Sequence, residues 1–342
     1  MNTSPSVDDG SYIAPGPARY GRLLAVLLPV IALIGAIVSV DHDPKPPWKD
    51  GNFSPHGYTL SLGLFLVPTI TLSWWLLRER ALHAYQIRAF LITAGLIVPT
   101  WCLLDILLGN TFFVFPNPGA TMQIFAPGYS FSQGWMRNIP IEEFAFYILG
   151  SFNILLGYIW ASESWLCLYS PSKEMYDARV AATPKLVNFR LTSLALGVAI
   201  FLAAVAWKKL GPHHMHAGFP GYFLFELLMV VLPIAMLDTA IGRLINGPAF
   251  VYKMLTLVFI SLLWEVTLAI PYGWWGYQSD QMMGIVIRPW FNLPLEAAIL
   301  WPCAAQLNIY LYEAARFYLH KQEPLLTVLF GPRSRELPQT RA

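Results

Sequence analysis

Charged residues are scarce in this sequence, and their scarcity excludes most soluble folds. Only 12% of its 342 residues are charged, whereas 56% are hydrophobic, and the mean hydropathy is +0.50. A soluble domain usually carries about 25% charged residues. The formal net charge is only +2, and no basic run interleaved with aromatics lies outside the apolar segments, so we expect no nucleic-acid partner. The composition indicates a polytopic membrane protein.

Cysteines and nucleotide-binding motifs are also scarce. The sequence has three scattered cysteines in or beside apolar segments, Cys102, Cys167 and Cys303. This arrangement indicates neither a disulfide framework nor a thiolate metal site. No Gly-x-Gly-x-x-Gly follows a strand pattern and no P-loop is present, so we expect no dinucleotide or ATP. His213, His214 and His216 lack a nearby acid or cysteine, which favours a solvated loop. We therefore expect neither a cofactor nor a metal.

Apolar runs long enough to cross a bilayer recur along the chain. A spanning helix needs roughly 18 or more predominantly apolar residues. The sequence predicts eight spans, at about 23–40, 59–77, 88–108, 141–161, 190–207, 220–240, 249–271 and 294–318. The predicted fold is an all-α polytopic membrane protein. Basic residues concentrate in the loops on one side, which by the positive-inside rule places both termini in the cytoplasm. We expect a multi-pass protein of the inner or plasma membrane.

A short acidic motif occurs twice, and each copy opens an apolar span. The first copy is Pro140-Ile141-Glu142-Glu143 and the second is Pro294-Leu295-Glu296. Proline at the first helical position and a glutamate soon after it also suit helix capping, an interpretation that stays open for each copy. An acid at the centre of a spanning helix costs about 2.5–3.5 kcal/mol on insertion scales. Duplication of such an expensive feature favours a functional site built from two halves.

The flanks of the two copies share an order of acid, aromatic cluster, arginine and Pro-x-Glu. Asp105 and Arg137 lie in the first series, and Glu265 and Arg288 in the second. The series predicts two parallel repeats of four spans each, because an even-numbered repeat keeps its orientation. The predicted organisation is a cytoplasmic tail at 1–22, a membrane repeat at 23–165, a cytoplasmic linker at 166–189, a second repeat at 190–320 and a cytoplasmic tail at 321–342.

The predicted site consists of acidic and aromatic residues near the membrane face at which both Pro-x-Glu helices begin. The predicted catalytic residues are Glu142, Glu143, Glu296, Asp105 and Glu265. The predicted substrate-binding residues are Trp101, Phe112, Phe146, Trp264, Trp274, Trp275 and Glu226. A carboxyl kept neutral by burial and by like charges can donate a proton, and aromatic faces stabilise cations. This combination suits protonation of an alkene and control of the carbocation, although an interfacial aromatic belt is an open alternative for most of the rings.

The run Ile139-Pro140-Ile141-Glu142-Glu143-Phe144-Ala145-Phe146-Tyr147 resembles the motif of integral-membrane lycopene cyclases of the heterodimeric type, including versions with both halves fused. The resemblance covers most of the chain as two repeat units. In the second copy, Ala297 replaces the second acid and Ile299-Leu300 replace the aromatic pair, a departure that related terpenoid cyclases would also accommodate.

The resemblance implies a redox-neutral isomerisation without a cofactor. A lipophilic polyene or terpenoid from the bilayer, most simply lycopene, would be protonated at its terminal double bond and would close a ring. By position, Glu142 or Glu296 is the predicted proton donor, and Glu143 and Asp105 tune the pair or accept the returning proton. A proton-coupled transporter and a non-catalytic assembly subunit are the alternatives. Sparse glycines and abundant aromatics within the spans favour the cyclase over the transporter.

Overall fold

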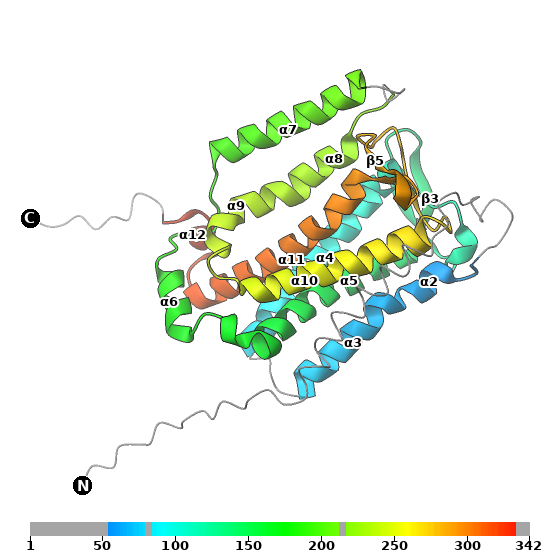
Figure 1. The fold of residues 1–342 in the computed structure, drawn as a ribbon. Helices are drawn as coiled ribbons and strands as arrows, with labels where there is room; N and C mark the ends of the chain where they lie inside the picture. The colour runs from blue at the N-terminus through cyan, green and yellow to red at the C-terminus, as the bar shows by residue number, and fades with distance from the viewer. Residues whose placement is uncertain (1–53, 79–83, 212–216, 333–342) are drawn as a thin grey trace, which may run out of the picture.

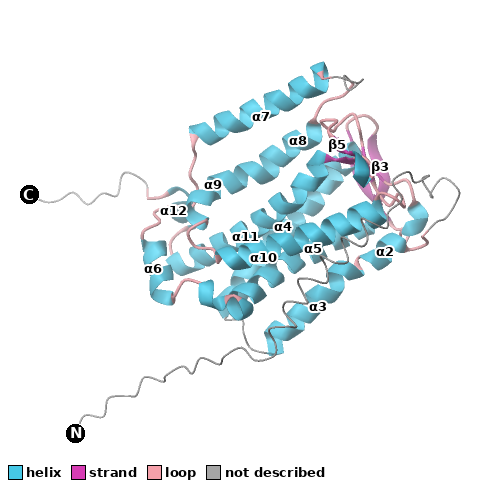
Figure 2. Ribbon diagram, in the orientation of Figure 1, coloured by secondary structure: helices cyan, strands magenta, loops and turns pink. Residues whose placement is uncertain are grey.

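The computed structural model describes residues 54–78, 84–211 and 217–332. Within these ranges the chain forms a bundle of long helices with short strands gathered at one end (Figures 1 and 2). The predicted span at 23–40 and the tail at 1–22 lie outside the described residues. The histidine cluster at 213–216 and residues 333–342 also lie outside them.

The elements of the first half of the chain are α2 (Gly57–Ser61), α3 (Gly63–Arg78), α4 (Ala84–Phe112), β1 (Phe113–Val114), η2 (Pro118–Ala120), β2 (Phe125–Ser130), β3 (Gly134–Pro140), α5 (Ile141–Trp160), η3 (Ala161–Trp165), η4 (Cys167–Tyr169) and α6 (Lys173–Ala181). Those of the second half are α7 (Leu191–Leu210), α8 (Gly221–Glu226), η5 (Leu227–Val231), α9 (Leu232–Ile241), α10 (Gly247–Trp264), η6 (Glu265–Ala269), β4 (Gly276–Tyr277), β5 (Val286–Ile287), η7 (Arg288–Trp290), β6 (Leu293–Pro294), α11 (Leu295–Lys321) and α12 (Leu325–Phe330). The predicted linker at 166–189 thus contains α6, and the predicted C-terminal tail contains α12.

Six helical segments of the described chain are long and apolar enough to cross a membrane. They are Gly57–Arg78, Ala84–Phe112, Ile141–Trp165, Leu191–Leu210, Gly221–Ile241 and Gly247–Ala269. These segments coincide with the second to seventh predicted spans, so a mostly helical, multi-pass membrane protein is confirmed. The eighth predicted span forms α11, a helix of 27 residues whose polar side chains keep it out of this apolar set. The total of eight spans and their arrangement as repeats stay predictions.

The helix α11 occupies the interior of the bundle. It packs against α4, α5, α9 and α10, while α3 packs against α5 at one side. By contrast, α7 lies along the edge of the bundle in Figure 1, and only 11% of its apolar 18-residue stretch is buried. A central position explains why α11 can carry more polar residues than the helices around it, since its neighbours shield them from lipid.

In the described ranges, three short antiparallel strand pairs close one end of the bundle. β2 pairs with β3 and β5 pairs with β6, whereas β1 pairs with β4 through Phe113 opposite Tyr277 and Val114 opposite Gly276. The all-α prediction missed these strands. Each motif helix follows such a pair directly, because β3 ends at Pro140 before α5 and β6 ends at Pro294 before α11. The order helix, single strand, hairpin and motif helix therefore occurs in both halves of the chain.

Within the described part of the chain, three of the spans contain a turn of π-helix, which the hydrophobic pattern did not predict. These turns are η3, η5 and η6, and η6 begins at Glu265. A π-turn inserts one extra residue into a helix and reorients the side chains around it, often at functional sites. In the span formed by α10 and η6, the π-turn thus begins at one of the predicted acids.

Candidate functional site

Both motif helices begin in the same way. Pro140 and Pro294 stand at the position before the first helical residue, with φ of -62° and -59° and extended ψ of 143° and 140°. Neither proline side chain can cap the helix, and the first acidic residue of each helix lies two positions later. The glutamates are therefore placed beside the backbone N–H groups at the end of the bundle where the strands lie.

Glu142 and Glu296 each hold the chain that precedes their own helix. Glu142 Oε1 accepts hydrogen bonds from the Met122 backbone N–H (2.7 Å) and from Thr59 Oγ1 (2.5 Å). Glu296 Oε1 accepts from the Met283 backbone N–H in the corresponding loop. Both glutamates are fully buried, and neither lines the apolar cavity between the two motif helices. This position argues against the predicted assignment of either residue as the proton donor, because a donor must reach the substrate.

We expect Glu296→Ala to lower the free energy of unfolding by about 1–3 kcal/mol, because it leaves the buried Met283 N–H without its acceptor. Glu296→Gln keeps an oxygen at the same place and should lose less stability. Thermal unfolding of the two variants in one detergent measures the difference. Equal stability of the alanine variant and the parent would contradict the proposed loop-holding role.

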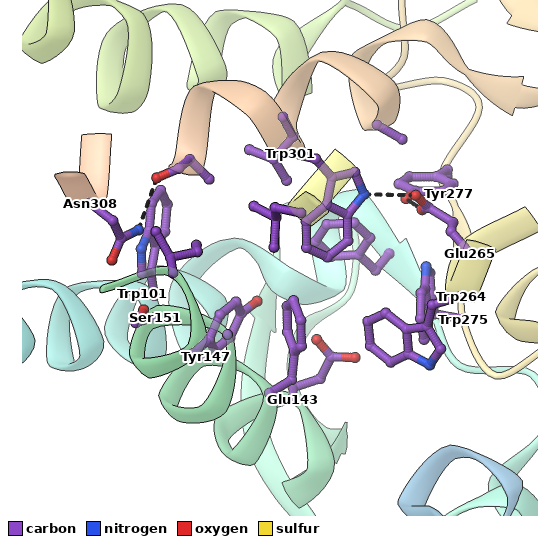
Figure 3. A pocket seen from close by; sticks show the side chains of 18 of the residues that line it. Trp101, Glu143, Tyr147, Ser151, Trp264, Glu265, Trp275, Tyr277, Trp301 and Asn308 are labelled. Carbon is purple, nitrogen blue, oxygen red and sulfur yellow. Dashed lines mark hydrogen bonds between the residues drawn. The ribbon is translucent and has the colours of Figure 1, made fainter. Parts of the chain in front are cut away.

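An apolar cavity of about 120 Å³ lies between the two motif helices (Figure 3). Among the predicted residues, its walls contain Glu143, Glu265, Trp101, Phe146, Trp264 and Trp275. The walls also contain Tyr58, Phe113, Tyr147, Tyr222, Tyr277 and Trp301, which the sequence did not single out. Ala297, the counterpart of Glu143 in the second motif, lines the same cavity. The first motif thus presents an acid to the cavity where the second presents a methyl group.

The two cavity acids come from different halves of the chain and differ in their hydrogen bonds. Glu143 Oε1 accepts a bond from Tyr58 Oη (2.6 Å). Glu265 accepts from Tyr277 Oη at one oxygen and from Trp301 Nε1 (2.9 Å) at the other. No lysine or arginine is among the cavity residues of the described chain. The arrangement therefore offers one acid held by a single donor and a second acid held by two.

Tyr277 is the link between the strands and Glu265. It lies in β4, outside the apolar spans, and its hydroxyl donates to the Glu265 carboxylate. Burial, and next the neighbouring Glu265 carboxyl, raise the pKa of Tyr277 well above its usual value. Its hydroxyl consequently keeps its proton across the physiological range and remains a hydrogen-bond donor to Glu265.

Trp264 is the centre of the aromatic wall. Its indole lies 4.6 Å from the Trp275 ring, 5.1 Å from Phe146 and 5.9 Å from Tyr58, measured between ring centroids. Trp264 Nε1 donates to Ser61 Oγ (2.8 Å), and only 1% of the residue is exposed. A buried ring fixed by packing and by one hydrogen bond presents its π-face in a constant position, as stabilisation of a cation requires.

The other predicted residues lie outside this cavity. Asp105 and Phe112 line an adjoining cavity of about 50 Å³, which shares Tyr147 with the main one. Trp274 stacks on the Tyr58 ring at 6.1 Å and donates from Nε1 to Ser54 Oγ (3.0 Å). Glu226 is buried, lines neither of these cavities, and its carboxyl oxygens have no hydrogen-bond partner among the described residues. The sequence predicted Asp105 as a catalytic residue and the other three as substrate-binding residues, and the structure places none of the four on the wall of the main cavity.

Two of the missed cavity residues had a usable signal in the sequence. Tyr147 and Trp301 lie four positions after Glu143 and Ala297, so each lies on the same helical face as its motif residue. The tyrosines of α2, α8 and β4 had no such signal, because they come from segments that only the tertiary fold brings together.

Within the described ranges, no group of three histidine, cysteine, aspartate or glutamate side chains could hold a metal ion. No model of a known protein family, no curated protein and no solved structure matches the chain.

Proposed function

We propose that this membrane protein is a cofactor-independent cyclase that protonates an alkene of a linear polyene or terpenoid lipid. The observation that carries the proposal is an apolar, aromatic cavity whose walls hold Glu143 and Glu265 and no basic side chain among the described residues. A buried carboxyl without a cation nearby has a lower free energy in its neutral form than in its charged form. A neutral carboxyl facing aromatic rings is a proton source in a place where a carbocation can survive.

In the proposed reaction Glu143 is the acid. Its proton adds to one carbon of the terminal double bond, and the positive charge forms on the adjacent carbon. The π-electrons of an internal alkene attack that carbon and close the ring by a new carbon–carbon bond. A proton then leaves a ring carbon and restores a double bond. One proton enters and one leaves, so the product is an isomer of the substrate and no electrons are transferred.

Glu265 is the proposed base. Tyr277 and Trp301 donate to its two oxygens, so a carboxylate at Glu265 has more hydrogen-bond donors to stabilise it than one at Glu143. Among the described residues, the Tyr58 hydroxyl is the one donor to Glu143. The difference in donor number separates the two roles, as catalytic carboxyl pairs in unlike surroundings generally do. The aromatic wall around Trp264 stabilises the cation between the two proton transfers.

Deuterium incorporation tests the proposal directly. The protein, in membranes of cells that accumulate lycopene or another linear terpenoid, is supplied with substrate in D₂O. We expect an isomeric cyclic product with one deuterium for each ring formed, because the proton comes from an exchangeable carboxyl. The Glu143→Gln membrane preparation is the matched control.

A cyclic product without deuterium would exclude proton initiation by an exchangeable acid. If lycopene gives no cyclic product, the carotenoid version of the proposal fails, and if a panel of linear prenyl lipids gives none, the cyclase proposal fails. The proposed orientation, with both termini in the cytoplasm, is tested separately by accessibility of tags at each terminus in intact cells.

A further inference from the structure

A second large cavity, separate from the acid cavity, contains a buried lysine. It has a volume of about 350 Å³ and lies between α3, α5 and α10, and it shares no lining residue with the acid cavity. Lys253 projects from α10 into this space, opposite Asn153 and Gly157 of α5. Lys253 lies six residues after the start of α10, or about 9 Å along the helix. The cavity is therefore nearer to the end of the bundle opposite the strands.

Lys253 has a neutral partner where a charged one would be expected. Its side chain is buried, with 3% of the residue exposed, and Nζ donates to Asn153 Oδ1 (2.6 Å). Among the described residues Lys253 forms no ion pair. An ammonium group has three N–H donors, of which the Asn153 amide takes one. A basic side chain inside a membrane span usually pairs with an acid or with backbone carbonyls, because the unpaired charge is expensive there.

The other buried lysine of the described chain, Lys208, has more hydrogen-bond acceptors from the protein than Lys253 has. Lys208 is 2% exposed, and its Nζ donates to two backbone oxygens, Ser279 O (2.7 Å) and Met282 O (2.6 Å). Its donors are largely satisfied by the protein itself, and it lines none of the cavities described above. Lys253 has one protein acceptor and a cavity in front of it. This contrast indicates that the remaining donors serve a ligand.

The walls of the cavity suit an aliphatic chain. They include Leu72 and Trp75 of α3, Trp160 of α5, and Tyr252 and Ile260 of α10. Val67 and Trp75 on the α3 side are 63% and 44% exposed at the bundle surface, where lipid would lie. The cavity thus combines one buried basic group with an apolar wall that reaches the lipid-facing surface. Gly157 keeps space at the lysine, since a Cβ there would lie 3.0 Å from Lys253 Cδ.

We propose that this cavity binds a membrane amphiphile through its acidic headgroup, with a carboxylate or phosphate as the counter-ion of Lys253 and the chain against the aromatic wall. The anion accepts hydrogen bonds from the ammonium donors that Asn153 does not use, and the pair is charge-assisted in a low-dielectric setting. The site is independent of the proposed cyclase reaction, because it uses neither of the cavity acids.

Quenching of tryptophan fluorescence by brominated lipids tests the site, because Trp75 and Trp160 line it. The full chain in a neutral detergent is titrated with dibromostearic acid and with its methyl ester, and then with brominated phosphatidic acid and the matching brominated diacylglycerol. Each pair differs only in the acidic group, and the two pairs distinguish a carboxylate from a phosphate source. We expect saturable quenching by at least one acid at a concentration about 30-fold below that of its uncharged partner.

Substitution of the lysine assigns this selectivity to one residue. Lys253→Met should weaken binding of the acid about 30-fold and leave the uncharged partner unchanged, whereas Lys253→Arg should keep most of the selectivity. Lys209→Met, which removes an exposed charge of another helix, is the control for net charge and should bind like the parent. Equal quenching by both members of each pair, or unchanged selectivity in folded Lys253→Met, would overturn the proposal.

Discussion

Glu143→Gln is expected to lower turnover by at least about 100-fold, because a general acid typically contributes that much or more to the rate. Glutamine keeps the shape of the side chain and an oxygen for the Tyr58 hydroxyl, so the cavity wall should stay in place. It has no acidic proton to give to an alkene, and therefore initiation should fail while substrate binding persists. Product formation by the purified variant and by the parent at saturating substrate is the measurement.

The adjacent residue provides a sharp control for this prediction. Glu142→Gln also removes one carboxyl from the first turn of α5, but Glu142 accepts bonds from Met122 and Thr59 and does not line the cavity. Turnover of Glu142→Gln should therefore stay within about threefold of the parent, since Gln Oε1 can still accept these bonds. The opposite ranking, with Glu142→Gln inactive and Glu143→Gln active, would return the donor role to the residue that the sequence pattern favoured.

Glu265→Gln is expected to lower turnover about 100-fold, for a different reason. The cation can still form from Glu143, but no carboxylate is in place to take the ring proton. The proton should then leave from other carbons, so the ratio of double-bond isomers in the remaining product should change. Chromatographic separation of the isomers, together with kcat and KM, distinguishes this loss from weaker substrate binding.

Tyr277→Phe is the matched variant for the Glu265 prediction. It removes one of the two donors to Glu265 and keeps the carboxylate and the aromatic ring. A loss of about tenfold or less, with the isomer ratio closer to that of the parent, is expected from one hydrogen bond to a charged group. An unchanged isomer ratio in Glu265→Gln would show that the ring proton leaves to another group.

Much of the helical framework could be predicted, because an apolar run of sufficient length is enough to indicate a membrane-spanning helix. The spans from 59–77 to 249–271 required only an apolar segment of sufficient length, and the corresponding helices match them. The duplicated Pro-x-Glu motif likewise marked the starts of α5 and α11. A helix in the bundle interior can carry polar residues, so its length and its hydropathy no longer go together. The helix α11 is long enough to span a membrane but is not apolar enough to be counted as an apolar span.

The different directions of the two motif glutamates could not be predicted from their spacing in the sequence. Glu142 and Glu143 are neighbours in the sequence, but successive helical residues differ by about 100° in direction. One carboxyl therefore lies against the loop at Met122 and the other faces the cavity. The loop that the first carboxyl holds precedes the β2–β3 hairpin, which the all-α prediction does not include. The sequence predicted Glu142 or Glu296 as the proton donor, whereas the acids on the cavity wall are Glu143 and Glu265.

The pairing of β1 with β4 has a consequence for how the chain is assembled. β1 comes from the N-terminal half and β4 from the C-terminal half, and the pair places Phe113 opposite Tyr277 on the wall of the acid cavity. Neither half can complete that wall by itself. Carrying both halves in one polypeptide fixes their ratio at one to one and makes their meeting intramolecular. Under this condition the two halves contribute unlike side chains, Glu143 and Ala297, to matching positions on the wall of one shared cavity.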